Sequence, residues 1–157
     1  MLIQIVDSQA RTIGAMNENL VHEQNLLHKK LILLLYDRDK GLCLKKNKCQ
    51  NKKDIWDFPI NVHVPINISE VELAKKNLIK LDYIKCPVKA LIRNHLWKEK
   101  REFISVYSVK SKISGPDVIF LQKEEFNFAL KKYPEIFSDY VHWVHSLGIV
   151  FSKDRGF

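Results

Sequence analysis

The stretch from Ile5 to Asp37, IVDSQARTIGAMNENLVHEQNLLHKKLILLLYD, carries the clearest structural signals of the chain. Asn17 has the chemistry of a helix N-cap, so we predict a short helix from there to about Gln24. The apolar run Leu31 to Tyr36 lies between charged residues, which is typical of a buried strand. It is much shorter than the roughly 20 apolar residues that a membrane helix needs.

The sequence after this strand predicts a hairpin. The segment from Asp37 to Gly41 has the composition of a tight turn, in which Gly41 can adopt a positive φ, and residues 42–44 then return as the partner strand. Further along, Ser69 and Glu72 have the spacing of a capping box at the start of a helix. The apolar residues on one face of that helix are Val71, Ala74, Leu78 and Leu81.

The remaining segments mix strand and helix patterns. We predict strands at residues 2–6, 61–64, 83–88, 89–96, 103–109 and 117–121, and helices at 123–132 and 138–147. Residues 46–54 are expected to form a polar loop. No linker divides the 157 residues, so we predict a single domain over residues 1–157. Its class is expected to be α/β (α+β), with a mixed β-sheet sandwiched between helices.

The composition narrows the class of partner. The net charge of +8 favours anionic partners such as a phosphorylated small molecule or a nucleotide. A solvated lysine surface is an equally good interpretation. Nucleic-acid binding ranks last, because the pattern lacks exposed aromatic residues interleaved on a basic face. Residues 1–6 lack the basic region and long apolar stretch of a secretory signal, so we expect none. We interpret Cys43, Cys49 and Cys86 as reduced thiols of a cytoplasmic protein.

The ordered set of motifs resembles the Nudix hydrolases, in particular the subgroup that includes isopentenyl-diphosphate isomerase. The matching residues are Val6-Asp7, Gly14, His22, Leu26, Leu27 and His28, followed by KGLCLKK (40–46), IWDF (55–58), NVHV (61–64) and REFISVY (101–107). The resemblance covers nearly the whole chain and implies a Nudix-like fold. It also implies an activity in which carboxylates of the Nudix box hold Mg²⁺ or Mn²⁺ against a diphosphate.

The Nudix box itself, G-x5-E-x7-R-E-U-x-E-E-x-G-U, is degenerate here. Aligned from Val62 to Ile84, it keeps only the apolar positions Leu78 and Ile84. The other positions are occupied by Val62, Ile68, Lys76, Asn77, Lys80, Leu81 and Tyr83. Hard divalent cations need oxygen ligands, so we expect no ordinary metal-dependent hydrolysis.

A second metal site is implied by the isomerase branch, where three histidines and late-strand glutamates bind a metal ion. The residues at the matching positions are His22, His28, His63 and Glu102. Three imidazoles and a carboxylate suit a transition metal such as Zn²⁺ or Mn²⁺. The alternative is that these histidines are hydrogen-bonded core residues. Isomerase activity is not expected, because Asn61 occupies the position of the isomerase's cysteine, and an amide cannot replace the thiol in proton transfer.

Two functions remain open from the sequence. The first is a Nudix-like pseudoenzyme that binds a phosphorylated ligand or a protein partner. The second is a divergent hydrolase of nucleoside or isoprenoid diphosphates, in which Glu102 is the candidate catalytic residue. For either function, the predicted ligand-binding residues are Trp56, His63, Lys46, Lys80 and Glu102.

Overall fold

A computed structural model describes residues 1–48, 53–81 and 86–152 of the chain. The chain forms two compact units. Unit 1 comprises Met1–Leu33 and Ile60–Tyr107, and unit 2 comprises Leu34–Pro59 and Ser108–Phe157. The strands β3 (His28–Asp37) and β8 (Glu102–Ser111) each begin in unit 1 and end in unit 2.

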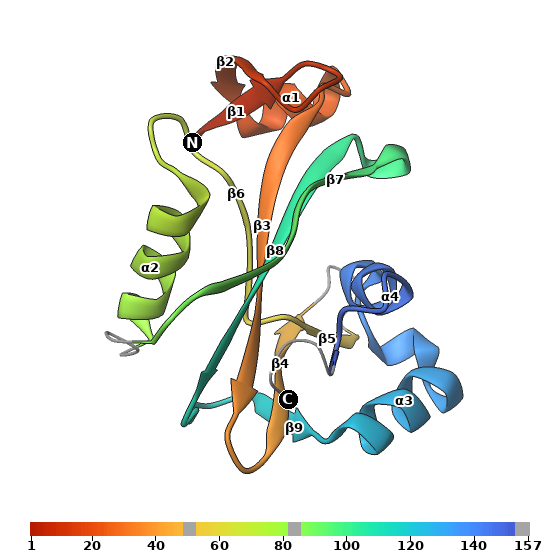
Figure 1. Ribbon diagram of the computed structural model, residues 1–157. Helices are drawn as coiled ribbons and strands as arrows, with labels where there is room; N and C mark the ends of the chain where they lie inside the picture. The colour runs from red at the N-terminus through yellow and green to blue at the C-terminus, as the bar shows by residue number, and fades with distance from the viewer. Residues whose placement is uncertain (49–52, 82–85, 153–157) are drawn as a thin grey trace. The chain divides into compact units, whose positions relative to one another are not determined.

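Unit 1 is a sheet with two helices (Figure 1). Besides the first parts of β3 and β8, its elements are β1 (Leu2–Val6), β2 (Thr12–Asn17), α1 (Glu18–Glu23), β6 (Ile60–His63), α2 (Glu70–Lys80), β7 (Lys89–Trp97) and the 3-10 helix η1 (Lys98–Lys100). Strand β1 pairs antiparallel with β2 and β3, and β6 pairs antiparallel with β3. Strand β8 pairs with β3 and β7.

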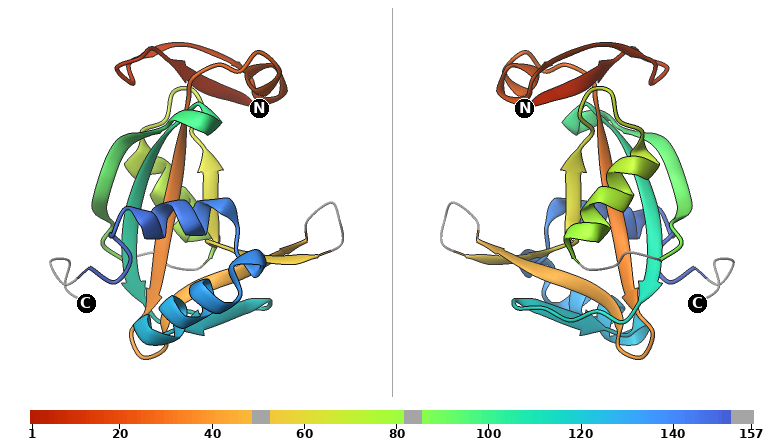
Figure 2. Two further views of the ribbon diagram at one scale, coloured as in Figure 1. Left: turned by 90° about the vertical axis from the view of Figure 1, so that its right-hand side faces the viewer. Right: turned by 90° about the vertical axis from the view of Figure 1, so that its left-hand side faces the viewer.

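Helix α2 begins with the predicted capping box. The Ser69 side chain accepts a hydrogen bond from the Glu72 amide, and the Glu72 side chain accepts one from the Ser69 amide. Figures 1 and 2 show the helix alongside β3 and β6. Its buried residues are Leu73, Ala74 and Leu78.

The predicted apolar face of α2 was wrong at two positions. Val71 is 37% exposed and Leu81 is 40% exposed, whereas Leu73 is buried. The buried stripe is therefore displaced around the helix from the predicted one. The helix ends at Lys80, so Leu81 is its C-cap residue and lies beyond the helical stripe, and Val71 lies in the first turn.

Unit 2 contains a second group of strands with two helices. Besides the ends of β3 and β8, its elements are β4 (Gly41–Lys48), β5 (Asp54–Asp57), β9 (Val118–Leu121), α3 (Lys123–Lys132), the 3-10 helix η2 (Pro134–Ile136) and α4 (Asp139–Ser146). Strand β4 pairs antiparallel with β3, β5 and β9. The helices bury Phe126, Val141 and Val144.

The turn between β3 and β4 forms as predicted. Gly41 has a φ of +98°, a conformation that glycine adopts without steric cost. Both carboxylate oxygens of Asp37 accept backbone hydrogen bonds: Oδ1 from Asp39 and Lys40, and Oδ2 from Ile113. The turn is thus fixed by one buried carboxylate.

The α+β class with a mixed sheet is confirmed, but several boundaries differ. Strand β2 was not predicted. Strand β4 continues to Lys48, so the predicted loop at 46–54 begins too early, and residues 49–52 lie outside the described part of the chain. The predicted strand at 83–88 is wrong at residues 86–88, which have no regular structure, while 83–85 lie outside the described residues.

Two of the three cysteines lie in the described part of the chain, and both are free. Cys43 is free and buried, and burial together with the nearby Asp37 raises the pKa of its thiol to about 12. Cys86 is free, whereas Cys49 lies outside the described residues.

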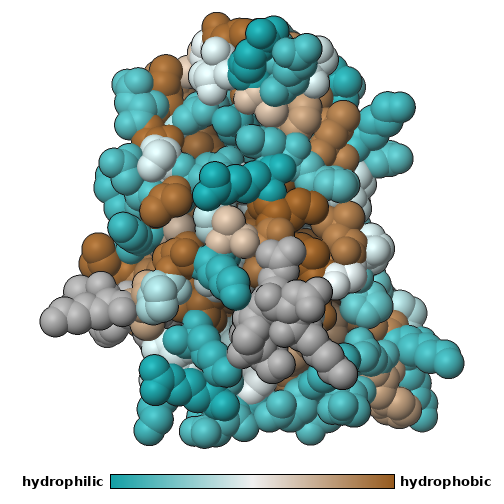
Figure 3. Space-filling model, viewed as in Figure 1, coloured by the Kyte–Doolittle hydropathy of each residue, from teal (hydrophilic) through white to brown (hydrophobic). Residues whose placement is uncertain are grey.

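Among the described residues, no helix is both long and apolar enough to cross a membrane. The face in Figure 3 mixes polar and apolar residues.

Candidate metal centre

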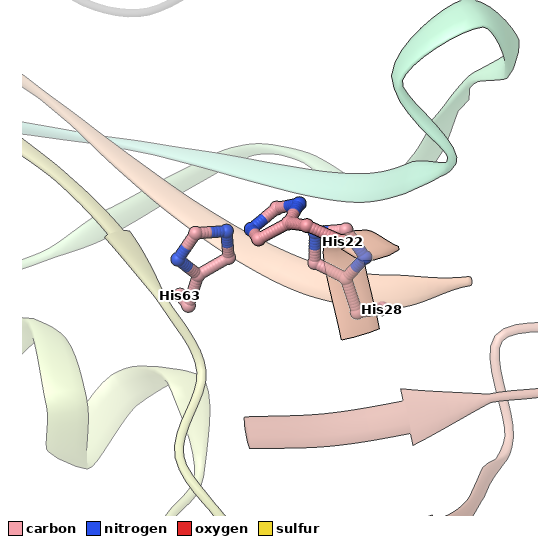
Figure 4. A group of neighbouring side chains, drawn as sticks. All are labelled: His22, His28 and His63. Atoms are coloured by element: carbon pink, nitrogen blue, oxygen red, sulfur yellow. The ribbon is translucent and has the colours of Figure 1, made fainter. Parts of the chain in front are cut away.

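Three histidines from three elements of unit 1 lie together (Figure 4). His22 lies on α1, His28 begins β3 and His63 ends β6. One ring nitrogen of each lies within 4.8 Å of one from each of the others. The ring centroids are 4.9 to 5.1 Å apart. The structure thus brings together the three histidines that the sequence singled out.

Glu102, the first residue of β8, completes the cluster. Its Oε1 atom lies 3.4 Å from Nε2 of His28 and 3.9 Å from Nε2 of His63. The Glu102 side chain is 3% exposed and that of His28 is 1% exposed. Burying a carboxylate is costly unless charges or hydrogen bonds compensate it, and the buried ammonium group of Lys30 supplies one such charge.

The hydrogen bonds of two rings fix which nitrogen carries the proton. Nδ1 of His28 lies 2.9 Å from the carbonyl oxygen of Leu26. Since a carbonyl only accepts, Nδ1 must donate. Nδ1 of His63 lies 3.0 Å from Oε1 of Glu18 and donates in the same way. In the neutral rings, the lone pairs are therefore on the Nε2 atoms.

Both of those Nε2 atoms are buried and have no hydrogen-bond partner. A buried polar atom left without a partner costs about 1–3 kcal/mol. A metal-ligating histidine has this pattern, with one ring nitrogen held by a carbonyl or carboxylate and the other free for the ion. The residues present therefore fit a metal ion.

The charge state of His63 is also suitable for a ligand. Burial, together with the neighbouring charges of Lys30 and His28, lowers the pKa of His63 from 6.5 to about 4, although Glu18 and Glu102 oppose this. The ring is therefore neutral at neutral pH. A metal ligand must be deprotonated, and His63 meets that condition without a change of pH.

Two residues of the cluster were missed by the sequence analysis. Glu18, at the start of α1, orients His63 as described above. Lys30, on β3, is buried, and its Nζ lies 3.9 Å from Oε1 of Glu102. Strand alternation could have revealed Lys30, because residues 28 and 30 of one strand point to the same face.

Helix α2, which aligns with the Nudix box, presents no comparable cluster of carboxylates. The Asn77 side chain donates a hydrogen bond to the Leu73 carbonyl of its own helix. Lys76 and Lys80 are exposed, as is Leu81 just beyond the helix. In the alignment made from the sequence, lysine and leucine stand where the box would have carboxylates, and the degenerate box stays a prediction.

The two acidic side chains of α2 are engaged elsewhere. Glu72 belongs to the capping box. Glu70 accepts hydrogen bonds from the hydroxyls of Ser105, at 2.9 Å, and Tyr107, at 3.0 Å. Burial and this carboxylate raise the pKa of Tyr107 to about 12, so its hydroxyl remains a donor. Asp82, the remaining acidic residue of the aligned box, lies outside the described residues.

The other predicted ligand residues are distributed over both units. Trp56 and Lys46 lie opposite one another on β5 and β4 of unit 2. Trp56 is half-buried, and Lys46 forms an ion pair with Asp54 at 2.9 Å, which raises the pKa of Lys46. Lys80 is exposed at the end of α2 in unit 1. Their joint role in ligand binding stays a prediction.

Comparison with known proteins identifies the fold. No family model and no curated protein matches the chain. Among solved structures, DR0079 from Deinococcus radiodurans has a TM-score of 0.70 at 12% identity, covering 93% of this chain and 98% of that one. Tm1382, provisionally assigned as a Nudix hydrolase, has a TM-score of 0.54 at 10% identity, covering 94% and 88%. The chain therefore has the fold of the Nudix hydrolases.

Proposed function

We propose that this chain is a Nudix-superfamily protein that has lost hydrolysis by the Nudix box and binds a phosphorylated ligand at a metal centre formed by His22, His28, His63 and Glu102. The observation that carries the proposal is the pair of buried Nε2 atoms of His28 and His63, which have no hydrogen-bond partner and face the same carboxylate oxygen. If both rings were fully hydrogen-bonded core residues, neither Nε2 atom would lack a partner.

The metal would be held by the three imidazoles and the Glu102 carboxylate. Imidazole ligands suit Zn²⁺, Cu²⁺, Ni²⁺ and Fe²⁺. When bound, the ion supplies a positive charge and a Lewis acid that can accept a phosphate oxygen. The protein's own part is to hold the rings: Leu26 and Glu18 fix the orientation of His28 and His63.

The loss of hydrolysis is proposed from α2. Mg²⁺ and Mn²⁺ need several oxygen ligands, but the aligned positions carry Lys76, Asn77, Lys80 and Leu81. Lysine at these positions repels a cation and attracts an anion. The net charge of +8 favours an anionic ligand in the same way.

Two assays test this proposal. Phosphate release from nucleoside and isoprenoid diphosphates should stay near background with Mg²⁺ or Mn²⁺. Thermal unfolding with Zn²⁺ present should shift upward when a phosphorylated ligand is added, because a ligand that binds only the folded state stabilises it. The shift should shrink in Lys80→Glu, whereas Lys75→Glu, an exposed lysine on the same helix, should retain it.

The alternative is a divergent hydrolase that uses the histidine centre in place of the box. The presence of Glu102 among the histidines favours it. Robust turnover of a diphosphate, abolished by Glu102→Gln, would establish this alternative and overturn the pseudoenzyme proposal. If no phosphorylated compound changes the unfolding temperature, a protein partner replaces the phosphorylated ligand.

A further inference from the structure

The buried lysine beside the metal centre is the feature that the proposed function leaves unused. Lys30 lies directly opposite His63 in the antiparallel pairing of β3 with β6. It is 7% exposed, and it lies two residues after His28 on the same strand. Because side chains alternate along a strand, Lys30 points to the same face as His28. An ammonium group is thus built into the histidine centre.

Lys30 and the histidines converge on one oxygen atom. Oε1 of Glu102 lies 3.9 Å from Nζ of Lys30, 3.4 Å from Nε2 of His28 and 3.9 Å from Nε2 of His63. If Lys30 replaced a metal ion, its ammonium group would donate hydrogen bonds to the imidazoles. The Nε2 atoms of His28 and His63 have no hydrogen-bond partner, so Lys30 does not have that role. Its effect is on the carboxylate, whose charge it neutralises in part.

This arrangement has different consequences for different ions. Mn²⁺, which the sequence alone left open beside Zn²⁺, prefers oxygen ligands, as the hard cation Mg²⁺ does. The other carboxylate at the cluster, Glu18, is engaged by Nδ1 of His63, which leaves Glu102 to supply the oxygen, and Lys30 pairs with it. A metal that prefers imidazole, such as Zn²⁺, depends much less on that carboxylate.

We infer that Lys30 is a specificity-determining residue of the metal centre: it weakens Glu102 as a ligand and so selects imidazole-preferring ions over hard, oxygen-preferring ones. The inference rests on the proposed function, because it requires a metal at this centre. It goes further by assigning the choice of metal to a residue that is not itself a ligand.

The test compares the dissociation constants of Zn²⁺ and Mn²⁺ in Lys30→Met and in the unchanged protein. Zn²⁺ is measured by competition with a chelating dye and Mn²⁺ by the electron paramagnetic resonance of the free ion. In Lys30→Met, we expect Mn²⁺ to bind about tenfold more tightly or better, because Glu102 is released from its ion pair and Mn²⁺ depends on that oxygen, while the loss of direct charge repulsion acts on both divalent ions alike. Zn²⁺ should gain less, so the preference for Zn²⁺ falls.

Two further variants provide controls. Lys29→Met makes the same change of charge one residue earlier, where the side chain lines a separate hollow with Ser69, Glu70 and Arg93, and it should leave the preference unchanged. Lys30→Arg keeps the charge and should retain the preference of the unchanged protein. If Lys30→Met does not fold, Lys30→Gln provides the same loss of charge with a polar side chain.

The outcomes distinguish failure of the inference about Lys30 from failure of the proposed metal centre. Suppose that the unchanged protein binds Zn²⁺, but that loss of the Lys30 charge changes the affinities for Zn²⁺ and Mn²⁺ by the same factor or leaves both unchanged. The inference about Lys30 is then wrong, while the proposed metal centre is retained. If the unchanged protein binds no Zn²⁺, the proposed function fails and the inference fails with it. An equal effect of Lys29→Met would show general surface charge to be the cause, which would also overturn the inference.

Discussion

Nε2 of His28 lies 3.4 Å from Oε1 of Glu102, with both side chains almost completely buried. The distance is too long for a strong hydrogen bond, and Nε2 of His28 has no other hydrogen-bond partner. When the ring is neutral with its proton on Nδ1, a lone pair faces a carboxylate. Lys30 neutralises that carboxylate in part, but Nε2 of His28 still has no donor, which is the physical basis for proposing a metal ion at this point.

The first prediction concerns the stability of the metal-free protein. Glu102→Gln removes the negative charge beside the buried Lys30, and breaking a buried pair on one side costs on the order of 3 kcal/mol. Urea unfolding in the presence of a chelator measures the loss. The double variant with Lys30→Met should be more stable than the sum of the two single effects. Strictly additive effects would show that Lys30 and Glu102 do not interact.

The second prediction concerns Glu18 as a positioning residue. Its carboxylate accepts a hydrogen bond from Nδ1 of His63, and loss of such a partner lowers metal affinity by roughly 10–100-fold. Glu18→Ala removes the acceptor and should therefore weaken Zn²⁺ binding by about that factor. Glu23→Ala, a change at an exposed residue of the same helix, is the control and should have no effect. Equal weakening by both variants would assign the effect to long-range charge instead.

Much of the fold was predictable because its signals are local. The capping box of Ser69 and Glu72 and the turn glycine Gly41 were identified from residue type and spacing alone, and both formed. Strand β2 was missed since its turn from β1 places Ala10, not glycine, at a positive φ of 62°. Its edge position also leaves Ile13 66% exposed, which weakens the apolar pattern.

The candidate site was predictable only in part. The histidines and Glu102 came from the family resemblance, and their proximity depends on the pairing of β3 with β6, which spacing alone does not specify. Lys30 was interpreted as a polar flank of the buried strand, because a lysine is rarely buried without a partner. Its partner, Glu102, is 72 residues later in the chain, beyond the reach of local patterns.

The third prediction concerns the turn after β3. Asp37 is buried; burial raises the pKa of its carboxyl, but the hydrogen bonds from the Ile113, Asp39 and Lys40 amides outweigh burial and lower it below 3.8. Asp37→Asn should destabilise the protein by roughly 1–3 kcal/mol at pH 7. The amide can no longer accept at both positions. Urea unfolding measures the loss.

The sign of the pH dependence follows from the lowered pKa. A carboxyl with a folded pKa below its unfolded value contributes stability above the unfolded pKa and loses it as the pH falls through the folded pKa. The difference between the unchanged protein and Asp37→Asn should therefore be full at pH 7 and shrink below about pH 4. A difference independent of pH down to pH 2 would contradict this account. Asp39→Asn, in the same turn but exposed, is the matched control.

The fourth prediction concerns Gly41. A Cβ at this position would meet the carbonyl oxygen of Leu121 on β9, and the φ of +98° is unfavourable for other residues. Gly41→Ala should destabilise the protein by roughly 1–3 kcal/mol or more. Gly14→Ala is the control, because its Cβ would make only an ordinary contact with Ile5 at 3.5 Å. Thermal unfolding of the two variants compares them directly, and equal midpoints would contradict the steric argument.

The central claim is that His22, His28, His63 and Glu102 bind a metal ion. Titration of the chelator-treated protein with Zn²⁺, followed by isothermal calorimetry, tests it most directly. The account predicts one Zn²⁺ ion per chain, and loss of that binding in His28→Ala and in His63→Ala but not in His142→Ala, whose ring is bound to the Pro134 carbonyl outside the centre. Absence of Zn²⁺ binding, or binding that survives the loss of both His28 and His63, would contradict it.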